Sequence, residues 1–205
     1  MQNKGNLIVI SGFSGVGKGT VVKRLVSDYG YSLSVSATTR QPREGEVDGR
    51  DYYFKSVAEF QNLIDYNGFI EWAQYVENYY GTPRAYVEAE LSEGRDVILE
   101  IEVQGAMNIK RQYPDAILIF LTAPDADCLK NRLAGRGTED DEVINKRMKR
   151  ALEESENMSE YEYIVINDDL DTCIRTVHGI IEAKRCEREN NMEFISQIKS
   201  ELRQL

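Results

Sequence analysis

The sequence predicts an α/β fold in which a parallel sheet is flanked by helices. Short continuous apolar runs, the pattern of strands buried on both faces, alternate along the chain with stretches of helical periodicity. Such alternation is typical of a parallel sheet covered by helices. The 205 residues, 41% hydrophobic and 29% charged, are enough for one compact domain with its own core and too apolar for disorder.

The expected elements follow in chain order. Strands are predicted at residues 7–11, 96–100, 116–121 and 163–166, and helices at 20–27, 103–112, 126–133, 142–157 and 170–188, with a terminal helix in the polar tail 187–205. Two regions break this alternation. Residues 37–94 are rich in Tyr, Gly and charge and too long for a simple crossover, and residues 135–157 form a second charged segment. Both are interpreted as lobes inserted into the sheet scaffold.

Composition excludes several classes of function. With 25 basic and 35 acidic residues the net charge is −10, which repels a phosphate backbone, so nucleic-acid binding is not expected. No apolar run approaches the roughly 20 residues of a membrane span. The apolar run near the start of the chain is too short for a secretory signal. A cytoplasmic location is therefore predicted. The three cysteines lack metal-binding spacing, and the single histidine, His178, cannot anchor a convincing catalytic triad.

A glycine-rich loop joins the first expected strand to the first expected helix. Residues 12–20 read GFSGVGKGT, a pattern that places backbone N–H groups around an anion at the positive end of a helix. Lys18 is expected to reach the β- and γ-phosphates of a nucleotide. Gly19 stands where Ser or Thr usually follows the lysine, with Thr20 one place later. Magnesium is therefore expected to rely on phosphate oxygens, water and a nearby carboxylate. By itself the loop predicts nucleoside triphosphate binding.

Two arginines three residues apart suggest a second phosphate site. Arg40 and Arg43 flank Pro42, and paired guanidinium groups match the oxygens of a phosphate monoester. Ser36 and Tyr52 lie nearby in sequence and could add hydrogen bonds. Either arginine alone could be a solvated surface charge, but the group together, in an acidic chain with a separate glycine loop, favours a binding function.

These segments resemble those of the guanylate kinase family. The similarity includes the glycine loop, the run S-x-TTR-x-PR-x-GE-x-x-G-x-DY at residues 36–52, IEWAQYVENYYGT at 70–82, LEIEVQG at 99–105, GRGT at 135–138, NKR at 145–147 and NDD at 167–169. The resemblance implies a P-loop core formed by residues 1–36, 95–134 and 158–205. It further implies a GMP-binding lobe at 37–94, a mobile lid at 135–157, and phosphoryl transfer from ATP to GMP.

The resemblance also implies roles for individual residues. The GMP phosphate would be held by Arg40, Arg43, Tyr52 and Tyr80. Guanine would be read by Glu71 and Thr82, with Ser36, Glu100 and Glu102 lining the same site. The ATP phosphates would be held by Ser14, Gly15, Val16, Gly17, Lys18, Gly19 and Thr20. Arg136 and Arg147 would close from the lid, and Asn167 and Asp168 would meet the adenine edge. The catalytic cations would be Lys18, Arg40, Arg43, Arg136 and Arg147.

Physical reasoning supports this assignment of the base reader. Guanine presents a ring N–H and an NH₂ group side by side, and an ionised Glu71 carboxylate, which is an acceptor only, could take both. The hydroxyl of Thr82 could donate to the guanine carbonyl oxygen.

Phosphoryl transfer needs converging cations and Mg²⁺ rather than a protein nucleophile. The expected cofactor is thus Mg²⁺, with Glu100 as a candidate to position the metal or water, and the expected partners are GMP and ATP.

Two departures and two alternatives accompany the resemblance. Phe13 replaces the proline usual in the family, and Glu102 stands where many members carry Asp.

One alternative function is a guanylate-kinase-like interaction module without catalysis, although Lys18 and both lid arginines are present. The other is a kinase for a different phosphorylated ribose compound, against which the pair of Glu71 and Thr82 argues. The sequence leaves a monomer and a homo-oligomer equally open.

Overall fold

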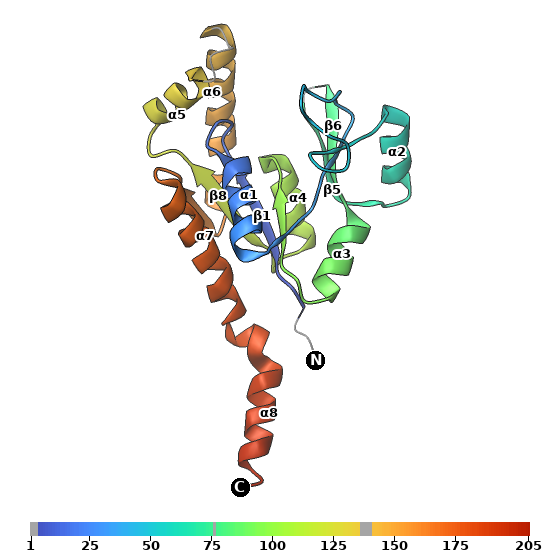
Figure 1. Cartoon of the computed structure of the whole chain (residues 1–205), viewed down its shortest axis with the longest axis vertical. Helices are drawn as coiled ribbons and strands as arrows, with labels where there is room; N and C mark the ends of the chain where they lie inside the picture. The colour runs from blue at the N-terminus through green and yellow to red at the C-terminus, as the bar shows by residue number, and fades with distance from the viewer. Residues whose placement is uncertain (1–3, 76, 136–140) are drawn as a thin grey trace.

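The computed structural model describes residues 4–75, 77–135 and 141–205 (Figure 1). Its central sheet has the strand order β2-β7-β1-β8-β9, and every neighbouring pair is parallel. The strands are β1 (Leu7–Gly12), β2 (Ser32–Leu33), β7 (Val97–Glu100), β8 (Ile117–Thr122) and β9 (Tyr163–Ile166). β1, β7 and β8 consist mostly of buried apolar residues, as expected of strands covered on both faces.

Helices flank this sheet and confirm the predicted fold class. They are α1 (Lys18–Tyr29), α4 (Val103–Gln112), α5 (Ala126–Ala134), α6 (Asp141–Ser155) and α7 (Leu170–Arg185). α1 packs beside α7, and both α1 and α4 contact β1. The side chains of Asp125 and Asp169 accept hydrogen bonds from backbone N–H groups in the first turns of α5 and α7, which stabilises these helix starts.

A second, smaller sheet lies beside the first (Figure 1). Its order is β4-β3-β6-β5, with β3 (Ala37–Thr38), β4 (Tyr53–Phe54), β5 (Phe69–Tyr75) and β6 (Asn78–Pro83). β5 and β6 form an antiparallel pair, and β3 joins β6 antiparallel and β4 parallel. Helix α2 (Val57–Asp65), which begins at a capping box between Ser56 and Glu59, contributes Phe60 to a small cluster with Ala37 and Phe69.

The remaining helices connect and extend these two parts. α3 (Arg84–Ser92) follows the second sheet, but its buried residues Val87 and Leu91 belong to the main cluster. The helix expected at 170–188 ends at Arg185, and 3₁₀ turns occupy Met158–Glu160 and Arg188–Asn191. α8 (Met192–Leu202) confirms a terminal helix and extends away from the body in Figure 1. No helix within the described ranges is long and apolar enough to cross a membrane.

The topology brings the predicted site residues to one end of the molecule. The carboxyl ends of parallel strands meet at the same edge of a sheet, where α/β proteins usually bind ligands. β1 leads there into the glycine loop, β7 into Glu100 and β9 into Asn167. In Figure 1, α5 and α6 lie on one side of this end and the second sheet with α2 on the other.

Candidate nucleotide site

The glycine loop is wound tightly against the ends of neighbouring strands. Gly12 and Gly17 have φ values of 147° and 92°, a region that glycine alone adopts readily. A Cβ atom added to Gly12 would lie 2.1 Å from the carbonyl oxygen of Leu121 in β8, and one added to Gly17 would lie 2.9 Å from Nδ2 of Asn167. The loop conformation therefore depends on glycine at both positions.

Lys18 and Asn167 hold the loop from two directions. The Lys18 ammonium donates to the carbonyl oxygens of Gly12 at 2.6 Å and Phe13 at 3.2 Å. Asn167, buried after β9, donates through Nδ2 to the carbonyl oxygen of Val16 at 2.7 Å. The structure therefore places Asn167 as a brace of the phosphate loop, whereas Asp168 beside it is exposed.

The side chain of Phe13 faces the protein core. Phe13 is buried and meets the ring of Phe120 edge to face, with the centroids 4.9 Å apart. Phe120 makes a similar contact with Tyr161, at 5.1 Å. Within the loop, Ser14, Gly15, Gly17, Lys18 and Gly19 are half-buried, Val16 is buried and Thr20 is exposed. Because Phe13 anchors the loop through its side chain, the main chain of the loop remains available at the rim.

Two acids, Glu100 and Glu102, lie at the end of β7 and just after it, at the same edge. Glu100 is half-buried, and a Cβ atom added to Gly19 would lie 3.7 Å from both of its carboxylate oxygens. Burial raises the pKa of Glu100, an effect opposed by the positive charge of Lys18. Glu102 is the residue that precedes α4. Among the described residues, His, Cys, Asp and Glu form no group of three or more suited to holding a metal ion.

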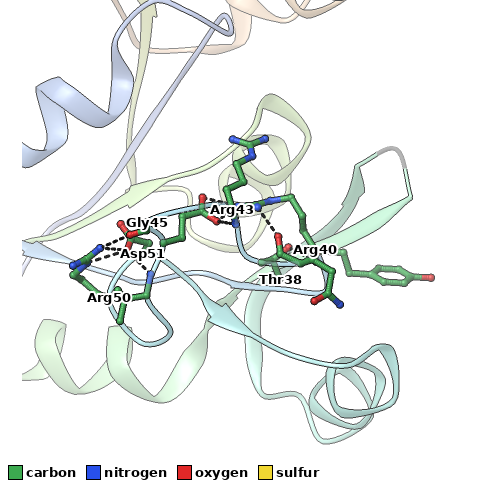
Figure 2. A network of polar contacts seen from close by, with 10 residues as sticks. Thr38, Arg40, Arg43, Gly45, Arg50 and Asp51 are labelled. Atoms are coloured by element: carbon green, nitrogen blue, oxygen red, sulfur yellow. Dashed lines mark hydrogen bonds and ion pairs between the residues drawn. The ribbon is translucent and has the colours of Figure 1, made fainter. Parts of the chain in front are cut away.

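The turn after β3 carries the arginine pair, and Figure 2 shows the polar network around it. One terminal nitrogen of Arg40 donates to both carboxylate oxygens of Glu46, at 2.9 and 3.0 Å. Glu46 also accepts from the backbone N–H of Arg43 at 2.7 Å. Its hydrogen bond with Arg40 lowers the pKa of Glu46. In Figure 2 the Arg43 guanidinium points away from this network, and Arg43 is exposed.

Aromatic side chains surround the Arg40 guanidinium. It lies 5.3 Å from the centroid of the Tyr52 ring and 5.9 Å from that of Phe54, distances suited to cation–π attraction. Tyr52 and Tyr80 are 6.1 Å apart between centroids. Burial, assisted by the charge of Glu100, raises the pKa of Tyr52 to about 12. Tyr52 therefore keeps its hydroxyl proton and can act as a donor. Ser36 is half-buried just before β3.

Glu71 and Thr82 are paired across β5 and β6. They are directly opposite in the strand register, and both are buried. The Thr82 hydroxyl donates to Oε1 of Glu71 at 2.6 Å. The structure thus brings together the two predicted base readers, and it commits the Thr82 proton to Glu71. Burial raises the pKa of Glu71 to about 7, although the hydrogen bonds from Thr82 oppose this shift.

Of the two predicted lid arginines, the structure describes Arg147. Arg136 lies outside the described residues, and Arg147 is half-buried on α6. One turn further on, Arg150 donates to a buried carboxylate, that of Glu154, at 2.9 Å. Burial raises the pKa of Glu154. The hydrogen bond from Arg150 lowers it, the negative charge of Glu102 raises it, and the positive charge of Lys18 lowers it.

Sequence reasoning assigned no role to Glu46 or Glu154. Glu46 lies in the motif run at residues 36–52, but the motif does not indicate which residue it pairs with. Glu154 carried no signal beyond its position in a charged helix. Both acids are paired with arginines of the site region, so they belong to its electrostatics.

Comparisons with known proteins agree with this geometry. A family model described as guanylate kinase matches residues 4–184. A guanylate kinase from Caldanaerobacter subterraneus subsp. tengcongensis is 46% identical over 202 residues, 98% of each chain, and one from Streptococcus thermophilus is 53% identical, covering 90% of this chain and 89% of its own. The crystal structure of guanylate kinase from Anaplasma phagocytophilum superposes with a TM-score of 0.77 at 29% identity, covering 91% and 89%. The chain belongs to the guanylate kinase family.

Proposed function

We propose that this protein transfers the terminal phosphoryl group of ATP to GMP, giving ADP and GDP. The observation that carries the proposal is the buried carboxylate of Glu71 on the second sheet. It shares that sheet region with the arginine pair, while the glycine loop lies at the carboxyl edge of the central sheet. One part of the molecule thus offers a triphosphate cradle and the other a site for a phosphorylated purine.

The donor side is formed by the loop and its lysine. Backbone N–H groups of residues 14–20 bind the ATP phosphates, and Lys18 exchanges its contacts with Gly12 and Phe13 for phosphate oxygens. Phosphoryl transfer requires alignment of both substrates and neutralisation of charge, which these groups supply. Asn167 maintains the loop, and Asp168 is exposed at the place where adenine is expected.

The chemistry of the donor set fits magnesium. Glu100 presents carboxylate oxygens close to Gly19, directly beside Lys18, and oxygen is the ligand that Mg²⁺ prefers. Since the described residues include no complete metal cluster, Glu100 would hold the ion partly through water. When bound with ATP, Mg²⁺ supplies charge neutralisation on the phosphate oxygens.

The acceptor side holds the phosphate and reads the base. Arg40, Arg43, Tyr52 and Tyr80 bind the GMP phosphate, with Ser36 and Glu102 lining the site. Glu71 accepts from the ring N–H and NH₂ of guanine, and adenine offers an acceptor nitrogen at the equivalent ring position. Once guanine donates to Glu71, the Thr82 hydroxyl is released to donate to the guanine carbonyl oxygen.

Closure of the two lobes completes the site. Residues 37–94 act as the GMP-binding lobe and residues 135–157 as the lid, which brings Arg136 and Arg147 towards the transferred group. Closure excludes water and assembles the cations around the developing charge. The distribution of arginines on both sides of the central sheet supports this motion.

A coupled assay of ADP release with GMP, AMP and IMP as acceptors tests the proposed function. We expect GMP to be the preferred acceptor, and Glu71→Gln to lower kcat/KM for GMP at least about 100-fold, because the new amide donor would face a donor on the base. The KM for ATP should change far less. Glu88→Gln, at an exposed site on α3, is the matched control. A wild-type enzyme without preference for GMP would refute the proposed function, and a Glu71→Gln variant within tenfold of wild type would remove Glu71 from base reading.

A further inference from the structure

Gly105 occupies a helix position where the backbone does not require glycine. It is the third residue of α4 and is buried. Its φ is not in the positive region, unlike those of Gly12, Gly15 and Gly17. In a helix, alanine is more favourable than glycine because glycine loses more conformational freedom. The reason for glycine here must therefore lie in what surrounds it.

The space beside Gly105 is filled by the carboxylate of Glu71. A Cβ atom added to Gly105 would lie 2.6 Å from Oε2 of Glu71 and 3.2 Å from its Cδ. A real Cβ atom cannot approach so closely, so one of the two groups would have to move. The backbone of α4 is fixed by its buried residues Val103, Ala106 and Ile109. The mobile group is therefore the end of the Glu71 side chain.

The carboxylate is consequently held between two elements. Thr82 on β6 donates to Oε1, while Oε2 lies against α4 at Gly105. One helical turn after Gly105, Nδ2 of Asn108 donates to the carbonyl oxygen of Trp72, the residue that follows Glu71, at 3.2 Å. The same face of α4 thus contacts both the backbone and the carboxylate of the base-reading strand.

We propose that Gly105 is a specificity-determining positioning residue, whose missing side chain lets the Glu71 carboxylate lie against α4 in the orientation that reads guanine. This inference rests on the proposed function and adds a residue to it. α4 begins directly after Glu100 and Glu102. One short segment, residues 100–105, therefore carries the acids near the phosphate loop and sets the position of the base reader.

The inference predicts that Gly105→Ala separates folding from recognition. The added methyl group displaces a flexible side-chain end rather than backbone, and alanine favours the helix, so the melting temperature should stay within a few degrees of wild type. Recognition of GMP should be weaker, because a misplacement of a binding group by about 1 Å can lower the reaction rate about 100-fold. We expect the KM for GMP to rise at least about tenfold, while the KM for ATP stays within about threefold.

Gly179→Ala is the matched control. Gly179 is also a glycine inside a helix, α7, but a Cβ atom added there meets nothing within 4 Å. This variant should retain both KM values. A second measurement is the ratio of kcat/KM for GMP to that for IMP, which lacks the NH₂ group. Since this ratio does not depend on the fraction of folded enzyme, it remains informative even if Gly105→Ala is unstable. We expect Gly105→Ala to lower it at least about fivefold.

A double-mutant cycle tests whether Gly105 acts through Glu71. In a Glu71→Ala background there is no carboxylate to displace, so adding Gly105→Ala should change kcat/KM for GMP less than about threefold. Equal losses in both backgrounds would overturn the inference, as would a Gly105→Ala variant with the GMP KM and the GMP-to-IMP ratio of wild type. Failure of the proposed function is distinguishable, because the wild-type enzyme would then show no preference for GMP.

Discussion

The two sheets of the protein differ in what stabilises them. The central sheet lies in a large cluster of buried apolar residues that draws on both of its faces. In the described part of the second sheet, the separate buried cluster consists of Ala37, Phe60 and Phe69 with a few partly buried neighbours, while Ile70 of β5 belongs to the large cluster. Other contacts of the second sheet include the ion pair of Arg40 with Glu46 and the stacking of Phe60 on Tyr79. We infer that the central sheet is the more stable unit and that the second sheet can move as a lobe upon it.

The two proposed substrate sites lie on different sheets. The phosphate loop is anchored in the large cluster through Phe13 and Val16, as preorganised donors for a transition state require. The proposed acceptor groups Arg40, Tyr52, Glu71 and Thr82 lie on or beside the second sheet, which has the smaller buried cluster. The mutations below are taken from the largest expected effect to the smallest, with each tenfold change in rate or affinity equal to about 1.4 kcal/mol.

The largest effect should come from removing an aromatic residue of each cluster. Phe120→Ala, in the centre of the large cluster, should lower the free energy of unfolding by about 3–5 kcal/mol. Phe60→Ala removes the ring that stacks on Phe69 at 4.5 Å and should speed amide exchange in β5 and β6 while β1 and β8 stay protected. Hydrogen exchange measures both. Uniform loss of protection in both variants would show that the two sheets unfold as one unit.

Lys18→Ala tests the donor side. Because the lysine meets charge that grows between the β- and γ-phosphates, we expect kcat to fall at least about 100-fold, with a smaller change in the KM for GMP. Steady-state kinetics with both substrates varied will separate the two. Lys23→Ala, on the same helix, is the control for loss of a charge. Near-normal turnover of Lys18→Ala would show that the loop is not the phosphate cradle.

The central sheet could be predicted from sequence more completely than the second one. The runs at 7–11, 116–121 and 163–166 match β1, β8 and β9 to within a residue at each end. β1 and β8 are buried and mostly apolar, as strands covered on both faces are. β9 has an equally apolar sequence, although Ile164 and Ile166 are exposed. β3 and β4 have two residues each, too few for any periodicity. The start of α2 is marked in the sequence by the capping box of Ser56 and Glu59.

The site shows the same contrast. Sequence motifs predicted the residues of the loop and of the acceptor lobe, because their order along the chain is distinctive. The motifs could not reveal that Asn167 braces Val16 or that Gly105 lies against Glu71, since these contacts join residues 151 and 34 positions apart. They also could not show that Thr82 donates to Glu71, because that depends on strand register.

A pH titration tests the acceptor side at Glu71. Burial raises its pKa from the ordinary 4.5 to about 7, so in the ligand-free protein Glu71 takes up a proton as the pH falls through about 7, whereas guanine requires the ionised carboxylate. The KM for GMP should therefore rise about tenfold from pH 8 to pH 6. The phosphate of GMP also ionises near pH 6, so Glu71→Gln, which retains only that dependence, is the control. An equal pH dependence in both proteins would contradict a titrating Glu71.

The Glu71 carboxylate should make the protein less stable as the pH rises, whereas the same rise in pH should strengthen GMP binding. Because the folded pKa of Glu71 is raised, the folded state binds more protons than the unfolded state between pH 4.5 and 7. The contribution of Glu71 to the free energy of unfolding is therefore full below pH 4.5 and is lost as the pH rises through 7. Denaturant titrations of wild type and Glu71→Gln without ligand will measure it. Conditions that favour GMP binding thus cost stability in the acceptor lobe.

Glu46→Gln should have the smallest effect. The Glu46 carboxylate orients Arg40 and accepts from the backbone N–H of Arg43. Removal of its charge should therefore leave both arginines, which are proposed to bind the GMP phosphate, less well positioned. Its charge also competes with the phosphate for Arg40, which opposes this effect. An ion pair of this partial exposure contributes up to about 1 kcal/mol, so we expect orientation to dominate only slightly and the KM for GMP to rise about threefold. Glu44→Gln, an exposed neighbour in the same turn, is the control. A lower KM in Glu46→Gln would instead show that competition for Arg40 outweighs its orientation, and that the polar network of the lobe restrains binding rather than preparing for it.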